Sequence, residues 1–211
     1  MARAFAEIAF TPAVRAEQAR QGSDQGYGKF LSDEAPPANQ LGPDEASFIE
    51  ARDSMFQATA ASNGWPYVQH RGGPKGFLQV LDARHLAFLE QRGNKQYLSI
   101  GNLATDDRIS LILVDYPNQR RLKIWGRARI VEAADDPDLM SSLNQGRSEY
   151  ELRSSANRAV VITVEALDWN CPKYIPRRFT AEEYTEVLEP LQSELERLRQ
   201  ENKELKAAAA S

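Results

Sequence analysis

The segment Tyr67–Gly76, YVQHRGGPKG, is the stretch of this sequence that most clearly suggests chemistry. It places an alternating, strand-like run directly before a basic, glycine-rich segment. Glycines let a backbone approach a ligand closely, and basic side chains attract anions. The chain has no phosphate-loop or dinucleotide-binding glycine signature. The segment therefore raises the hypothesis of a local anion site, and the alternative is a glycine-rich turn with Arg71 in a surface ion pair.

The alternation within this segment predicts two faces. If it is regular, Gln69 and Arg71 point to one face of a strand, whereas Val68 and His70 point to the other. One of these faces should meet a ligand. His70 alone is weak evidence, because it is as compatible with a structural hydrogen bond as with proton transfer.

The composition is that of a soluble globular protein with one core. The chain has 211 residues, of which 42% are hydrophobic and 27% are charged. No stretch reaches the roughly 18 uncharged apolar residues of a membrane helix. The apolar patch near the N-terminus is interrupted by Glu7, and no small-residue cleavage signature follows it. These features predict a cytoplasmic protein without membrane association.

Metal and nucleic-acid binding are not expected. The chain contains one cysteine, Cys171, and two histidines, His70 and His85. A lone cysteine cannot form an intramolecular disulfide, and these residues do not supply a tetrahedral zinc site. The formal net charge of −4 disfavours general affinity for nucleic acid, although a local basic patch can still bind a small anion.

Residues 1–43 are expected to form a short helix and a connector. The run TPAVRAEQARQGS starts with Thr11 as a capping residue and Pro12 at the first helical position, which favours a helix start. Residues 31–45 are rich in Pro, Asp and Asn and indicate a surface connector. Two further elements should follow this connector.

The first of these is a helix of about three turns that starts with Asp44 as its cap. It is predicted because Phe48, Ile49 and Met55 are spaced as on one helical face. The second is a β-hairpin around Asn63-Gly64, a dipeptide that readily adopts the positive φ angles of a tight turn.

Five later runs have the length and apolar content of strands, and a short helix is expected at DDPDLMSSL. These runs are GFLQVLD, HLAFLEQ, ISLILVDY, RRLKIWGRARIVE and RAVVITVEALDWN. Six or seven strands joined by short loops predict a mainly β protein, with a closed or nearly closed antiparallel barrel and helices at its margins.

The C-terminal segment 181–211 has a different pattern, in which apolar residues recur at alternating spacings of three and four. The repeating residues are Leu191, Leu195, Leu198, Asn202 and Leu205. With Asn202 at heptad position a, the g and e positions pair Glu194 with Arg199 and Glu201 with Lys206. These opposite charges suit a parallel dimer.

Two interpretations of this segment stay open. Pro190 is expected to limit the uninterrupted helix to little more than two heptads. One interpretation is a short coiled coil, and the other is an amphipathic helix folded onto its own barrel.

Four runs between Asp44 and Val164 together resemble the pyridoxamine 5'-phosphate oxidase-like family of FMN-binding split barrels. They are GWPYVQHRGGPKGFLQVLD, RGNKQYLSIGNL, DDRISLILVDY and RRLKIWGRARIV. The flanking runs FTPAVRAEQARQGS and DWNCPKYIPRRF resemble a bacterial flavin-nucleotide-binding subgroup of this family. The resemblance implies a split-barrel domain over 44–180, FMN as the cofactor, and a homodimer with the flavin at the subunit interface.

The resemblance also places a phosphate-binding cluster in RGNKQ, directly after the strand HLAFLEQ. The candidates are Arg92, Asn94, Lys95, Gln96 and Ser99. A dianionic phosphate needs several charge-assisted donors, which a lysine with neighbouring amides can supply. Without the resemblance, a solvated turn with ordinary surface charge would be preferred.

The resemblance sets YVQHRGGPKG beside the flavin ring. The candidates there are Gln69, His70, Arg71, Gly72 and Lys75. The N–H groups of Gly72 and Gly73 could donate to the flavin edge, and Arg71 would favour the reduced, anionic flavin. Arg121 falls where relatives often carry Gln, and Lys123 shares its face. Trp125 could flank the ring, although a core aromatic is the commoner role.

The run WNCPKYIPRRF is expected to close over the cofactor cleft. It offers Trp169, with Arg177 or Arg178, to an anionic substrate. Cys171 has no base beside it in the sequence and is not assigned as a nucleophile. No catalytic residue is assigned.

Two departures argue against oxidation of vitamin B6. True pyridoxamine phosphate oxidases carry a lysine at the end of a strand that here ends at Asp82, and they carry an Arg-x-His pair that is missing after Arg158. We therefore expect an FMN-dependent oxidoreductase that passes a hydride through flavin N5, with a small substrate or NAD(P)H as reaction partner. The alternatives are a non-catalytic flavin carrier or redox sensor, and a relative that uses F420.

Overall fold

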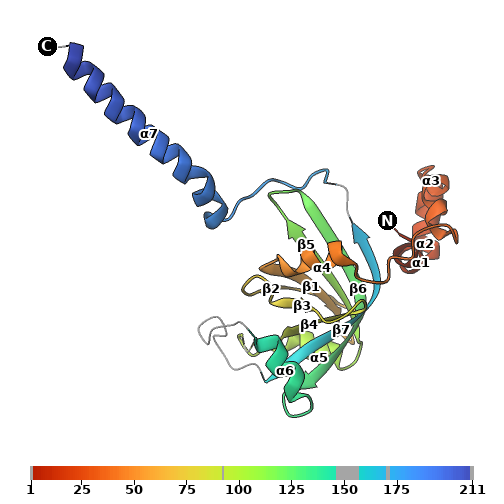
Figure 1. Ribbon diagram of the computed structural model, residues 1–211. Coiled ribbons are helices and arrows are strands. Elements are labelled where there is room, and N and C mark those ends of the chain that lie inside the picture. The colour runs from red at the N-terminus through yellow and green to blue at the C-terminus, as the bar shows by residue number, and fades with distance from the viewer. Residues whose placement is uncertain (1, 92, 146–156, 170–171, 210–211) are drawn as a thin grey trace. The chain divides into compact units, whose positions relative to one another are not determined.

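The computed structural model describes residues 2–91, 93–145, 157–169 and 172–209 (Figure 1). No helix in this part of the chain is long and apolar enough to cross a lipid bilayer. Contacts divide the protein into two compact units. The larger unit comprises Met1–Asp115 and Arg120–Pro172, and the smaller comprises Tyr116–Gln119 and Lys173–Ser211.

One seven-stranded antiparallel sheet forms the centre of the larger unit (Figure 1). The strands are β1 Ser54–Ala60, β2 Pro66–Gly72, β3 Leu78–Val80, β4 His85–Leu89, β5 Arg108–Asp115, β6 Arg120–Glu132 and β7 Arg158–Trp169. Their order is β2-β1-β5-β6-β7-β4-β3, so β2 and β3 lie at the two ends of the order. The sheet is a half-barrel flanked by helices, which confirms the predicted mainly β, antiparallel fold.

The core lies on the inner face of this half-barrel. Alternate residues of β5 and β6, including Leu111, Leu122 and Ile124, are completely buried there. Strand β6 pairs with β7 along most of its length, with a bulge between Trp125 and Gly126. A Cβ at Gly126 would clash with the Thr163 carbonyl oxygen, so the bulge admits only glycine.

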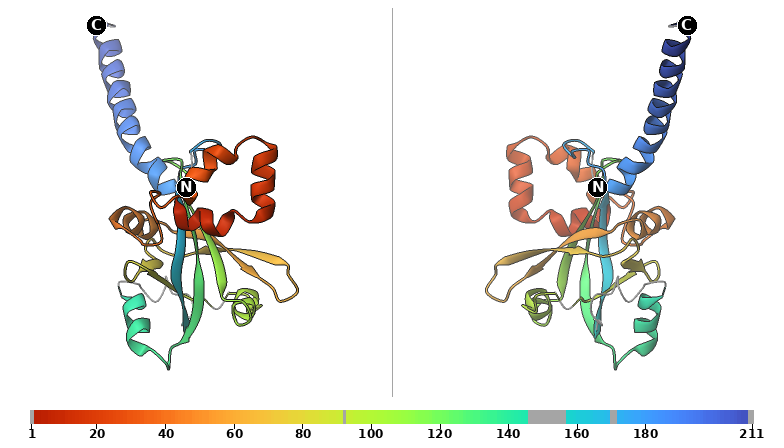
Figure 2. Two further views of the ribbon diagram at one scale, coloured as in Figure 1. Left: turned by 90° about the vertical axis from the view of Figure 1, so that its right-hand side faces the viewer. Right: turned by 90° about the vertical axis from the view of Figure 1, so that its left-hand side faces the viewer.

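The predicted hairpin around Asn63-Gly64 is confirmed. Strands β1 and β2 pair over their full lengths, and Gly64 has a φ of 88°. Figure 2 shows this hairpin projecting sideways from the sheet, with helix α5, Leu98–Leu103, beside it. Helix α6, Pro137–Asn144, confirms the helix expected at DDPDLMSSL.

Helix α4, Pro43–Glu50, is shorter than predicted and starts differently. Its cap is Gly42, whose N–H donates to the Glu45 carboxylate at 3.0 Å, and not Asp44. The helical spacing of Met55 was misleading, because Met55 lies in β1 and reaches the core from a strand. A single apolar residue is compatible with both the helical repeat and the strand repeat, and here the pairing of β1 in the sheet shows that Met55 belongs to a strand.

The N-terminal residues form α1 Arg3–Ala9, α2 Pro12–Arg20, α3 Asp24–Gly28 and the 3-10 helix η1 Lys29–Leu31. Thr11 caps α2 by accepting a hydrogen bond from the Val14 N–H, as predicted. Helix α1 was not predicted. Its Phe5 is buried and stacks on Trp125 with ring centroids 4.3 Å apart, so α1 covers part of β6.

The smaller unit consists mainly of helix α7, Ala181–Ala209. The expectation that Pro190 bounds this helix is wrong, because α7 continues through Pro190. Thr180 caps the helix by accepting a hydrogen bond from the Glu183 N–H.

Candidate functional site

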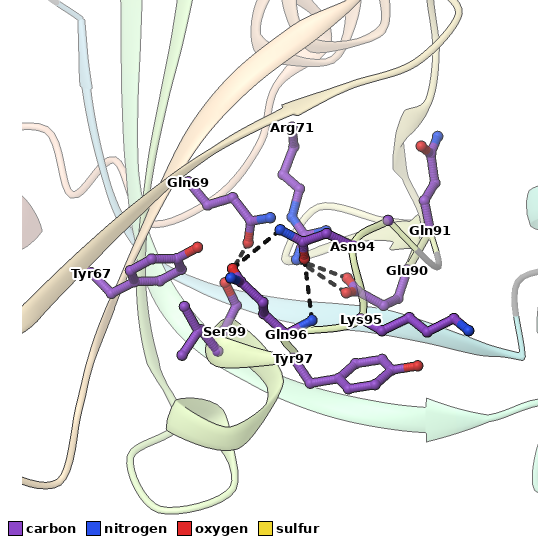
Figure 3. Close-up of a pocket in the computed structure, with 12 residues that line it drawn as sticks. Tyr67, Gln69, Arg71, Glu90, Gln91, Asn94, Lys95, Gln96, Tyr97 and Ser99 are labelled. Carbon is purple, nitrogen blue, oxygen red and sulfur yellow. Dashed lines mark hydrogen bonds and ion pairs between the residues drawn. The ribbon is translucent and has the colours of Figure 1, made fainter.

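A cavity of about 190 Å³ lies between β2, the end of β4 and the loop that leads into α5 (Figure 3). Strand β2 contributes Tyr67, Gln69 and Arg71, and the end of β4 contributes Glu90 and Gln91. The loop and the start of α5 contribute residues 93–99. Two sequence segments that were predicted separately, YVQHRGGPKG and RGNKQ, therefore meet at one cavity.

The sheet register explains why these β2 residues face the cavity. Gln69 lies opposite Gln57 and Arg71 lies opposite Met55, so both share the inner face of the half-barrel. Val68 and His70 point to the outer face, as the alternation predicted, and the His70 ring contacts Phe56 there. Hence His70 does not line the cavity.

An ion pair between Arg71 and Glu90 occupies the cavity. The Arg71 Nη2 atom lies 2.9 Å from a Glu90 carboxylate oxygen, and their side chains are only 12% and 8% exposed. Burial raises the pKa of Glu90, although Arg71 and the more distant Arg158 act in the opposite direction. The Arg71 Nε atom is buried without a hydrogen-bond partner among the described residues. The Glu90 Oε2 atom, which lies 2.9 Å from Arg71 Nη2, is also buried without a hydrogen bond from the described part of the chain, so the pair leaves one buried donor and one buried acceptor unsatisfied.

Amide side chains and a hydroxyl form the rest of the polar lining. The Ser99 hydroxyl donates to Gln69 Oε1 at 2.8 Å, and the Asn94 amide donates to Gln96 Oε1 at 3.1 Å. The Gln96 backbone N–H donates to Asn94 Oδ1 at 3.1 Å. These contacts, shown in Figure 3, orient the amides around the cavity.

The loop itself has an unusual backbone. Lys95 and Tyr97 have φ angles of 62° and 52°, which are uncommon for residues other than glycine. Such conformations are often retained at ligand sites. Lys95 lines the cavity, but its side chain extends away from the Arg71–Glu90 pair in Figure 3.

The glycines after β2 have a structural role. A Cβ at Gly73 would lie 2.6 Å from the Phe77 Cβ, so close packing against Phe77 requires glycine there. The Gly73 N–H donates to the Asp53 carbonyl at 2.8 Å, and the expected donation of this group to a ligand is therefore wrong. Gly72 accepts a hydrogen bond from Gln91 through its carbonyl, and neither Gly72 nor Lys75 lines the cavity.

Arg121 and Lys123 lie on the other face of the sheet. Residues of β6 that precede and follow Leu122 point outward, whereas Leu122 itself is in the core. The Lys123 ammonium lies 3.2 Å from the Asp168 carboxylate and 5.4 Å from the centre of the Phe5 ring. These two candidates are thus separated from the cavity by the thickness of the sheet.

Trp169, the predicted substrate residue of the larger unit, does not line this cavity. The Trp169 indole N–H donates to Glu45 at 2.7 Å, and its ring lies against the Arg120 guanidinium and beside a second cavity of about 580 Å³. Arg177 and Arg178 belong to the smaller unit, where they contact Gln119 and Tyr116. Arg92, Asn170 and Cys171 lie outside the described residues.

Glu90 is the charged cavity residue that the sequence analysis missed; the other lining residues that it did not name as candidates are Tyr67, Gln91, Gly93, Tyr97 and Leu98. Glu90 stands at the end of the apolar run HLAFL, where a polar residue is normally read as the solvated end of a strand. The available signal was its place directly before RGNKQ. Within the described residues, no group of three or more His, Cys, Asp or Glu side chains could hold a metal ion.

The seven-stranded half-barrel has the architecture of a split barrel, and its polar cavity lies beside the edge strand β2. Residues 42–170, more than half of the chain, match the family described as Pyridoxamine 5'-phosphate oxidase. The chain therefore belongs to this family. No curated protein matches the chain.

Three solved structures are similar to this chain, and one of them supports the same fold. A HupZ variant from Group A Streptococcus is 15% identical over 62% of this chain and 99% of its own, with a TM-score of 0.50. The heme storage protein HutZ from Vibrio cholerae is 16% identical over 61% and 94%, with a TM-score of 0.46. An FMN-binding protein from Syntrophomonas wolfei is 11% identical over 74% and 97%, with a TM-score of 0.46. At these identities only a shared fold follows, and the HupZ match alone is close enough to support it.

Proposed function

We propose that this protein binds FMN and that the phosphate end of the ligand enters the cavity beside Arg71. The observation that carries the proposal is the buried Arg71 Nε without a partner, in a cavity lined by amides, within the residues that match the family. A buried donor without an acceptor is costly, and a ligand phosphate oxygen would satisfy it.

The size of the cavity limits what it can hold. About 190 Å³ is below the roughly 300 Å³ at which pockets begin to enclose a whole small ligand. It is suited to a phosphate and the adjoining part of a ribityl chain. Because Glu90 already neutralises Arg71, the amides of Gln69, Asn94 and Gln96 must supply further donors, and the Lys95 ammonium would have to turn toward the phosphate to join them.

The flavin ring would then lie outside this cavity, and we propose that a second copy of the chain covers it. The outer face of the sheet next to β2 exposes large apolar side chains, with Val68 61% exposed and Phe56 41% exposed. Adjacent exposed apolar residues of this kind mark interaction surfaces. Arg121 and Lys123 share this outer face and would reach the ring across the interface.

When bound, FMN supplies hydride transfer at its N5 atom, and the chain's residues position the flavin and its reaction partner. We propose an oxidoreductase acting on a small substrate or NAD(P)H. Vitamin B6 oxidation is not part of the proposal. Where the oxidases carry a lysine, this chain has Asp82, which accepts hydrogen bonds from the Arg84 N–H at 2.7 Å and from His85 at 2.8 Å.

Two measurements test the proposal. An absorption spectrum of the purified protein should show the bands of bound oxidised flavin, whereas a band at shorter wavelength than the flavin's visible band, as expected for oxidised F420, would replace FMN by F420. A colourless protein that binds neither cofactor on titration would contradict both. Reduction of the bound flavin by NADH or NADPH faster than free FMN would support an enzyme, and its failure with every donor would favour a carrier or sensor.

A further inference from the structure

Helix α7 carries a continuous exposed apolar stripe. Its members are between 44% and 64% exposed, a range set by Leu188 and Leu205. The stripe consists of Tyr184, Leu188, Leu191, Leu195, Leu198 and Leu205. We propose that α7 pairs in parallel with α7 of a second copy as a two-stranded coiled coil.

The spacing of this stripe is that of a coiled-coil seam. Because α7 continues through Pro190, the seam extends upstream of the segment that the sequence alone allowed, and it includes Leu188 at position a and Tyr184 at position d. Pro190 falls at position c, outside the seam, where its ring does not obstruct a partner helix. The seam therefore spans about three heptads.

Charges beside the seam select the partner and its direction. In a parallel pair the g and e positions place Glu194 against Arg199 and Glu201 against Lys206 of the other copy. In an antiparallel pair g faces g and e faces e, so like charges would meet. A second copy in parallel orientation is thus the occupant that this helix complements.

Two other features agree with this arrangement. Asn202 occupies an a position, where asparagine favours two parallel strands in register. Within α7, Arg197 holds Glu194 at 2.8 Å and Glu201 at 3.1 Å. These pairs are exposed and weak, so both glutamates can exchange Arg197 for the partner's cations at little cost.

Cysteine cross-linking of the full chain tests this proposal. In a Cys171→Ser background, Leu191→Cys and Leu205→Cys place a thiol at two d positions two heptads apart, and Ser193→Cys and Ala207→Cys are matched controls at outward f positions. A parallel, in-register pair should give disulfide-linked dimers at both seam positions and only traces at the controls. The controls account for any proximity caused by a dimer of the barrels.

Equal cross-linking at seam and control positions would overturn the proposal. So would cross-linking of a Leu205→Cys chain only with a Leu188→Cys chain, because an antiparallel pair sets d positions against a positions of the partner. A second variant, Glu194→Lys with Glu201→Lys, should abolish the seam cross-link, and mixing it with Arg199→Glu, Lys206→Glu chains should restore the cross-link.

A separate observation concerns Glu90, and this second inference rests on the proposed function. The geometry points to Glu90 as the residue that restrains the affinity of the cavity for an anionic end group. Its carboxylate lies 2.9 Å from the Arg71 Nη2 atom, and both side chains are nearly inaccessible to water. A ligand phosphate must therefore compete with Glu90 for the same guanidinium.

The charges in the cavity make this competition matter. Of the described residues that line it, Arg71 and Lys95 are cationic and Glu90 is anionic. A phosphate bearing about −1.5 to −2 charges meets a cavity with little net positive charge. Interactions between charges this close are strong when water is excluded. Glu90 would thus keep FMN exchangeable instead of permanently bound.

Titration of the full chain with FMN and with riboflavin, which lacks the phosphate, tests this inference. Glu90→Gln should strengthen FMN binding about tenfold and leave riboflavin binding unchanged. Asp106→Asn, which removes a partly exposed carboxylate outside the cavity, should change neither. If FMN binding by Glu90→Gln is unchanged or weaker, the inference fails while the proposed function stands. If neither flavin binds the wild type, the proposed function itself fails.

Discussion

Two arginine–carboxylate pairs in this molecule show how strongly burial changes the same chemistry. Arg71 and Glu90 are 12% and 8% exposed in the cavity, whereas Arg108 and Asp106 are 70% and 21% exposed at the surface. Burial raises the pKa of Glu90 in spite of its arginine. Hydrogen bonds from Arg108 lower the pKa of Asp106 to about 2. In the cavity, the loss of hydration has a larger effect on the carboxylate pKa than the ion pair has. At the surface, the hydrogen bonds from arginine have the larger effect.

The largest expected effect follows from breaking the buried pair. Arg71→Met leaves Glu90 buried without a counter-charge and should lower the free energy of unfolding by about 3 kcal/mol. Arg108→Met, the matched change at the surface, should produce a clearly smaller loss, because water can solvate the Asp106 carboxylate that remains. Urea denaturation of both variants measures the difference, and equal losses would remove the distinction between the two pairs.

A smaller effect is expected on ligand affinity. Arg71→Ala and Lys95→Ala should each weaken FMN binding by about 1.5–3 kcal/mol, because each removes a charged donor to the phosphate. Arg108→Ala should leave the affinity unchanged. Fluorescence titration with FMN measures all three, and unchanged affinity in both cavity variants would place the phosphate elsewhere.

The two carboxylates should also give pH dependences of opposite sign. Folded Glu90 has a raised pKa and holds its proton more tightly than the unfolded chain, so stability falls as the pH rises through the window between the two pKa values. Folded Asp106 has a lowered pKa, so its contribution is present above the unfolded value of 3.8 and is lost as the pH falls toward about 2.

Urea midpoints measured across both pH windows test this difference. Glu90→Gln should remove the fall in stability with rising pH and leave the loss of stability at low pH. Asp106→Asn should do the reverse. If stability still falls with pH in the Glu90 window after Glu90→Gln, another group causes that pH dependence.

Local alternation predicted which residues of β2 share a face, but it could not predict which residues of distant strands join them. Gln69 lies on the same face as Gln57 and, through β1 and β5, as Leu111 and Ile124. Arg121 therefore lies on the opposite face. Only the register across these strands reveals that Arg71 lies on one face of the sheet, whereas Arg121 and Lys123 lie on the other.

Glu90 escaped prediction for a related reason. Its burial depends on β4 pairing with β7 and on the approach of Arg71 from β2, which lies at the other end of the strand order. Nothing in the neighbouring sequence reports such a contact. Pro190 shows the opposite error, because a local rule about proline was applied where the helix continues.

The most direct test of the account is the preference of the protein for FMN over riboflavin, measured by titration of wild type, Arg71→Met and Arg108→Met. If the phosphate lies beside Arg71, the wild type and Arg108→Met should prefer FMN by about tenfold or more, and Arg71→Met should lose most of that preference. A folded Arg71→Met protein that keeps the full preference for FMN would contradict the account.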